Sequence, residues 1–62
     1  MRREEILMKS AGKLHELAAD IERTHTVRGE WILNDPEDFR AKQDYDECIQ
    51  LAGGLMVMAR AI

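Results

Sequence analysis

The sequence predicts an all-α fold: a hairpin of two antiparallel helices that pairs with a second copy to form a four-helix bundle. Two long segments repeat apolar residues in alternating steps of three and four, the pattern of helices with one buried stripe. A chain of 62 residues also builds only a small core, because it buries only about 60% of its unfolded surface. Residues 51–62 are apolar on nearly every side of a helix, and one partner helix does not cover so many sides.

The first helix is expected over residues 3–27. Large and small side chains alternate along its apolar stripe, so that a facing helix can approach closely. Ile6 and Leu17 widen the stripe on one side. Gly29 is expected to cap the end of this helix in a left-handed conformation, and residues 28–35 then form the connection. The stripe consists of Leu7, Ala11, Leu14, Ala18, Ile21 and His25.

The second helix is expected over residues 36–61. Asp35 is a capping carboxylate, and Pro36 suits the first helical position. Gly53 and Gly54 lie inside this helix, where each costs about 1 kcal/mol relative to alanine. They indicate either a close helix crossing or a bend, and Ala52 beside them favours the crossing. The apolar stripe consists of Ala41, Tyr45, Cys48, Ala52, Leu55, Ala59 and Ile62, flanked by Ile49 and Met56.

Self-association is the stabilising device that the composition leaves. Cys48 is the one cysteine, so no disulfide forms within the chain, and only His15 and His25 could join it as zinc ligands. Small scaffolds without such links are commonly stabilised by another copy. A dimer is favoured over a tetramer, with the orientation of the two hairpins left open. The predicted dimer core consists of Leu7, Leu14, Ala18, Ile21, Tyr45, Cys48, Ala52, Leu55, Met56, Ala59 and Ile62.

Charge and hydropathy argue against membrane insertion and secretion. The net charge is −3, with no strongly basic or acidic half. The longest uncharged apolar-rich segment, residues 51–59, is much shorter than the roughly 20 residues that a membrane span needs. Residues 1–5 contain two arginines and two glutamates without a following apolar run, unlike a secretory signal. We therefore expect a cytoplasmic protein with no membrane partner.

Catalytic and metal-binding patterns are weak, so neither catalytic residues nor a cofactor is predicted. Glu22 and His25 match the Glu-x-x-His spacing of di-iron four-helix bundles, which makes a metal-binding bundle one alternative function. That site needs a carboxylate from the second helix, and Asp44 lies only at the edge of the stripe. Asp44 and Glu47 form a single acidic pair without a counterpart on the first helix. Cys48, on the inner stripe, is expected to pack as a small apolar residue.

Nucleic-acid binding is the other alternative function, and it is not favoured. Arg2, Lys9 and Lys13 lie within about 40° of one another on the first helix. Glu5 and Glu16 share that side, so that no continuous positive stripe forms to neutralise phosphates. Any such binding is expected to be weak.

Apolar residues off the stripe are the candidates for binding an unidentified protein partner. Phe39 and Val57 point the same way on the second helix, far from its stripe, and Trp31 lies in the connection. In one interpretation the connection folds back and Trp31 covers Phe39. In the other, Trp31, Phe39 and Val57 form a partner-binding patch with an aromatic anchor. We therefore expect a non-enzymatic, homodimeric module for protein interaction or regulation.

Two resemblances accompany these patterns. The alternating small and large stripe resembles that of Rop-type helical-hairpin dimers, although the basic face needed for their RNA binding is lacking. Three short stretches also resemble small accessory proteins of lambda-like temperate phages, encoded between the exonuclease and excisionase genes. This second resemblance implies a small helical protein, made early, that acts on a host or phage partner during the lysis–lysogeny decision. The stretches are residues 28–31, 34–39 and 51–55.

Overall fold

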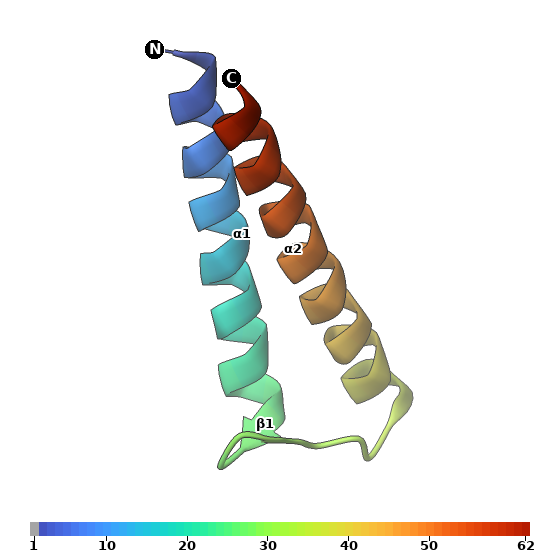
Figure 1. Ribbon diagram of the computed structural model, residues 1–62. Coiled ribbons are helices and arrows are strands. Elements are labelled where there is room, and N and C mark those ends of the chain that lie inside the picture. The colour runs from blue at the N-terminus through green and yellow to red at the C-terminus, as the bar shows by residue number, and fades with distance from the viewer. Residues whose placement is uncertain (1) are drawn as a thin grey trace.

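The structure, a computed structural model, describes residues 2–62 and confirms an all-α hairpin of two helices. Helix α1 (Arg3–His25) and helix α2 (Pro36–Ala61) run antiparallel, and their outer ends lie side by side at the two termini (Figure 1). Strands β1 (Thr26–Val27) and β2 (Glu30–Trp31) form a minimal antiparallel hairpin in the connection. The molecule measures 43 × 15 × 15 Å, so that it is a rod with two helices across its width.

Helix α2 begins where the sequence predicts, for the reason that the sequence predicts. The Asp35 carboxylate accepts a hydrogen bond from the Asp38 backbone N–H at 3.1 Å, and Pro36 occupies the first turn. This bond satisfies one of the free N–H groups that every helix start exposes. Helix α1 begins without a side-chain cap, with Glu4 and Glu5 in its first turn.

The connection differs from the prediction. Helix α1 ends at His25, two residues before the expected position, because Thr26 and Val27 are extended and pair with β2. Arg28 and Gly29 both have positive φ, at 56° and 83°, as a two-residue type I′ turn between strands requires. Gly29 therefore serves a β-turn, and its expected role as a helix cap is wrong. β-Branched residues favour extended backbone, which lets strand pairing replace the last helical turn.

Small side chains alone are buried between the helices. No large side chain of the described residues is fully buried. Small residues let two helices approach closely, and Ala52, with 0% exposure, is the most completely enclosed. A Cβ added at Gly53 or Gly54 would meet nothing within 4 Å, so the predicted close crossing at these glycines is wrong within the hairpin. The buried residues are Ala11, Ala18, Ala41, Cys48, Ala52 and Ala59.

Candidate interaction surfaces

Contacts at the connected end set the register of the two helices. His25 Nδ1 lies 3.0 Å from the Asp38 carboxylate. About one turn before His25 on α1, the Glu22 carboxylate lies near Tyr45 and raises the pKa of its phenol. Since both helices rise about 1.5 Å per residue, this register places Leu51 level with Leu14, near the middle of the rod.

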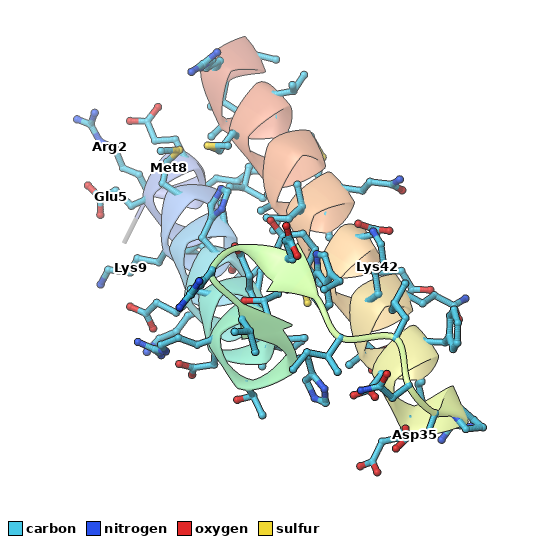
Figure 2. All side chains as sticks on the ribbon, turned by 90° about the horizontal axis from the view of Figure 1, so that it is seen from below. Arg2, Glu5, Met8, Lys9, Asp35 and Lys42 are labelled. Carbon is cyan, nitrogen blue, oxygen red and sulfur yellow. The ribbon has the colours of Figure 1, made fainter. Side chains whose placement is uncertain are left out.

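The hairpin has two broad sides, and Trp31 closes one of them. The Trp31 ring packs edge-on against Tyr45, with ring centroids 5.2 Å apart, and Lys42 Nζ lies 5.5 Å from the Trp31 ring centroid. Lys42, which projects from α2 in Figure 2, thereby makes a cation–π contact. We call this side, with Glu22, Trp31, Lys42 and Tyr45, the Trp31 face.

Hydrogen bonds fasten the connection to the start of α2. The Asp38 carboxylate faces His25 Nδ1 through one oxygen, and its other oxygen accepts a hydrogen bond from the Asn34 backbone N–H at 3.3 Å. The hydrogen bond with His25 lowers the pKa of Asp38 below its usual value of 3.8. The Ile32 backbone N–H donates to the His25 carbonyl at 2.9 Å. Both ends of the connection are thus held, which positions Trp31.

The Trp31 face becomes mixed in character toward the termini. Met8 and Ile49 lie on this side, 49% and 36% exposed. At about 100° per residue, Glu4, His15 and Arg60 share the same helix flanks. Polar and ionisable groups are therefore interleaved with the apolar groups along this side.

The opposite side of the hairpin is aliphatic over most of its length. At about 100° per residue its α1 residues lie within about 80° of one another, and its α2 residues within about 60°. In antiparallel right-handed helices these two flanks share one side, just as Glu22 and Tyr45 share the other. We call this side the aliphatic face. It consists of Ile6, Leu14, Leu17, Ile21, Leu51, Leu55, Met58 and Ile62.

The aliphatic face is open to solvent. Ile6, Leu17, Leu51, Met58 and Ile62 are each between 49% and 60% exposed. The remaining members, Leu14, Ile21 and Leu55, are half-buried. Exposed apolar area that is contiguous, rather than scattered, is typical of an interaction surface.

The predicted dimer core is divided between the helix seam and the surfaces beside it. Four of its members are buried between α1 and α2: Ala18, Cys48, Ala52 and Ala59. Tyr45 and Met56 lie half-buried on the side of the Trp31 face, and Leu7 is half-buried at the seam. The others belong to the aliphatic face: Leu14, Ile21, Leu55 and Ile62.

The predicted dimer core omitted Leu51 and Met58, although both belong to residues 51–62, which the sequence shows to be apolar on nearly every side of the helix. Leu51, Leu55, Met58 and Ile62 are spaced by four, three and four residues, a second heptad stripe beside the first. Ile6 and Leu17 were expected to widen the α1 stripe, and the structure places both on this same side. The second stripe was therefore readable in the sequence as a repeat of its own.

The three residues of the predicted partner-binding patch are not brought together around Phe39. Trp31 packs on Tyr45, and Phe39 remains 56% exposed, so the predicted covering of Phe39 by Trp31 is wrong. Val57 is 66% exposed and lies on the same outer side of α2 as Phe39, five turns away, which is about 27 Å. Phe39 and Val57 thus remain exposed as separate apolar points.

The residues of the metal-binding alternative point to different neighbours. His25 is hydrogen-bonded to Asp38, whereas Glu22 lies beside Tyr45. Across residues 2–62, no three His, Cys, Asp or Glu side chains gather closely enough to hold a metal ion. Cys48 is a buried free thiol between the helices.

The basic residues of the nucleic-acid alternative lie beside carboxylates. Arg2 pairs with Glu4 at 3.4 Å, and Lys13 pairs with Glu16 at 3.8 Å. Figure 2 shows Arg2, Glu5 and Lys9 projecting from the side of α1 that faces away from α2. Acidic and basic groups therefore alternate there, as the sequence predicts.

Comparison of the chain with protein-family models, with curated proteins and with solved structures finds no match. Over the part of the chain that the structure describes, neither helix has the length and apolar character needed to cross a membrane. The function is therefore inferred from the surfaces of the hairpin.

Proposed function

We propose that this protein is a non-enzymatic, homodimeric module for protein interaction or regulation, in which two hairpins form a four-helix bundle. The observation that carries the proposal is the open aliphatic face, where five large apolar side chains are each about half exposed. Burying such a surface is the main favourable contribution to protein association. The lone thiol of Cys48 suits the reducing cytoplasm, where we place the protein.

The surface area of the single hairpin supports self-association. Its accessible surface is 4894 Å². A compact monomer of 7.1 kDa is expected to expose about 4100 Å², so the hairpin exposes roughly 800 Å² more. Each partner in a standard protein interface buries about 800 Å². The excess is therefore of the size that one interface removes.

A second protein is proposed to bind the outer side of the bundle. Phe39 is an exposed aromatic side chain, and aromatic residues are enriched among those that dominate binding energy. It lies in the first turns of α2, beside the connection that the Trp31 contacts hold in place. Partner binding at Phe39 leaves the helix seam and the dimer undisturbed.

Sedimentation equilibrium at micromolar concentration tests the dimer. We expect a particle of twice the chain mass, with a helical circular dichroism spectrum. A well-folded particle of 7.1 kDa would contradict the proposal. Partner binding is tested separately by capture on immobilised wild-type protein and on Phe39→Asp. We expect Phe39→Asp to remain dimeric and lose the captured partner, whereas Gln43→Asp, at an exposed polar position of the same helix, retains it.

A further inference from the structure

We infer that the second copy docks on the aliphatic face with its connection at the opposite end, so that Arg3 of each copy lies opposite Asp44 of the other. The inference rests on the proposed self-association and specifies its surface and its geometry. Two independent observations carry it: the distribution of apolar groups between the two sides of the hairpin, and the charges at the two ends of the aliphatic face.

The choice of face follows from the contrast between the two sides. Between Arg3 at one end and Asp44 at the other, the two helix flanks that form the aliphatic face hold no charged residue. The Trp31 face carries Glu22 and Lys42, and its terminal half carries Glu4 and Arg60. Charged groups are depleted from the centres of protein interfaces, because burying them without partners costs more than apolar burial returns. The roughly 800 Å² of excess surface is also enough for one such face and not for two.

The aliphatic face occupies only part of the rod. It begins at the termini with Ile6 and Ile62 and ends level with Ile21, about one helical turn before the connection. Level with Ile21 the same side carries Asp44, and beyond it Arg40 and Glu37 follow. A two-fold axis near Leu14 and Leu51 superimposes the apolar lengths of two copies. This overlap is possible with the connections at the same end or at opposite ends, so apolar burial alone does not choose between them.

The charged residues at the two ends of the aliphatic face favour one of the two orientations. Arg3 lies 18 residues before Ile21, and Asp44 lies 18 residues before Ile62, which in each case is five full helical turns. Both charges therefore project on the aliphatic side, Arg3 about one turn beyond Ile6 at the terminal edge and Asp44 level with Ile21 at the inner edge. None of the ion pairs among residues 2–62 uses either of them.

Like charges meet when the connections lie at the same end, since Arg3 then faces Arg3 and Asp44 faces Asp44. With the connections at opposite ends, each Arg3 lies within about one helical turn of the other copy's Asp44, and both symmetric pairs are attractive. Within one chain the two residues are about 28 Å apart along the rod, so they form no pair there. Complementary charges at the rim fix orientation and register more than they add affinity.

The choice of face is tested with a matched pair of variants on α2. Leu51 and Val57 are 60% and 66% exposed, and only Leu51 belongs to the aliphatic face. We expect Leu51→Asp to raise the dimer Kd at least 100-fold and Val57→Asp to change it less than about threefold. If Leu51→Asp does not fold, Leu17→Ser replaces it and is expected to raise the Kd at least tenfold. A dimer that survives at Leu51 and Leu17 but not at Val57 overturns the face, whereas a monomeric wild type overturns the proposed function.

The orientation is tested with charge reversals. We expect Arg3→Asp and Asp44→Arg each to raise the dimer Kd roughly tenfold, because each turns two attractive pairs into repulsive ones. The double variant restores both pairs and is expected to return to within about threefold of wild type. If the connections lie at the same end, each single reversal replaces one like-charged pair by another and leaves the Kd unchanged, which overturns the inference.

A distance measurement gives a second test of orientation that does not depend on affinity. A spin label is placed at exposed Phe39, on the outer side of α2, as Phe39→Cys in a Cys48→Ser background. With the connections at opposite ends, the two labels of a dimer are expected about 40 Å apart. With the connections at the same end they lie within about 25 Å, because only the width of the bundle separates them. A measured distance in the shorter range overturns the proposed orientation and leaves the proposed dimer intact.

Discussion

The two broad sides of this hairpin are formed by the same two helices, but the connection covers only one of them. On the Trp31 face, the connection reaches back over α2 and covers Tyr45 with an aromatic ring. On the aliphatic face, no segment of residues 2–62 covers the apolar side chains, and Leu51 stays 60% exposed. A connection of ten residues leaves the end of the rod on one side only, so a single hairpin can close one face and not both.

The side chains on each side suit the degree to which that side is covered. The Trp31 face mixes aromatic contacts, a cation–π contact and ionisable groups, all of which remain stable at the edge of water. The aliphatic face offers dispersion and burial alone, which become favourable only against another apolar surface. In the proposed dimer, stability is therefore divided between contacts within the chain on one side and contacts with the second copy on the other.

The largest loss of stability is expected from a substitution that separates the two helices, because both sides depend on their packing. Ala52 is completely buried at the seam. We expect Ala52→Leu to lower the free energy of unfolding by about 3 kcal/mol, because added methylenes in a packed core force the surrounding backbone apart. Urea denaturation at one fixed protein concentration measures the change. Ala61→Leu, at an exposed position of the same helix, is expected to have almost no effect, and equal losses in the two variants would contradict the close packing at Ala52.

Removing the Trp31 ring is expected to destabilise the Trp31 face and leave the aliphatic face unchanged. We expect Trp31→Ala to lower the free energy of unfolding by about 2 kcal/mol, since the half-buried ring packs on Tyr45 and Lys42. The dimer Kd is expected to change less than about threefold, because the ring lies on the side opposite the proposed interface. Denaturation and sedimentation measure the two quantities. Leu33→Ala, in the same connection, is the control, and a large rise in Kd for Trp31→Ala alone would place Trp31 in the interface.

The smallest expected effect concerns the anchor of the connection at Asp38. The pKa of this carboxyl is lowered in the folded protein, above all by the hydrogen bond with His25. Its stabilising contribution is therefore fully present above the unfolded pKa, which is about 4, and is lost as the pH falls through the lower folded pKa. We expect the wild type to lose more stability than Asp38→Asn between pH 5 and about pH 2.5.

Thermal unfolding across this pH range measures the loss. Glu47→Gln, on an exposed acid of the same helix that forms none of the ion pairs among residues 2–62, is expected to keep the full pH dependence of the wild type. If Asp38→Asn unfolds with the same pH dependence as the wild type, the carboxyl does not anchor the connection.

Local signals predicted the helices well and the connection poorly. The capping carboxylate of Asp35 and the proline after it marked the start of α2, because both act through the backbone of their own turn. Gly29 was predicted as a helix cap, since both a cap and a type I′ turn need a residue at positive φ. Only the pairing of β1 with β2 distinguishes these two uses of glycine.

The sequence by itself determined the number of helices, their amphipathic stripes and the small residues at their seam, because these depend on periodicity and local backbone preference. Tertiary structure alone decided that Trp31 packs on Tyr45 and leaves Phe39 exposed, and that two flanking stripes merge into one aliphatic face. Both outcomes depend on which side the connection takes and on the register that His25 and Asp38 set. Such contacts join residues distant in the chain, so the spacing of residues within either helix does not predict them.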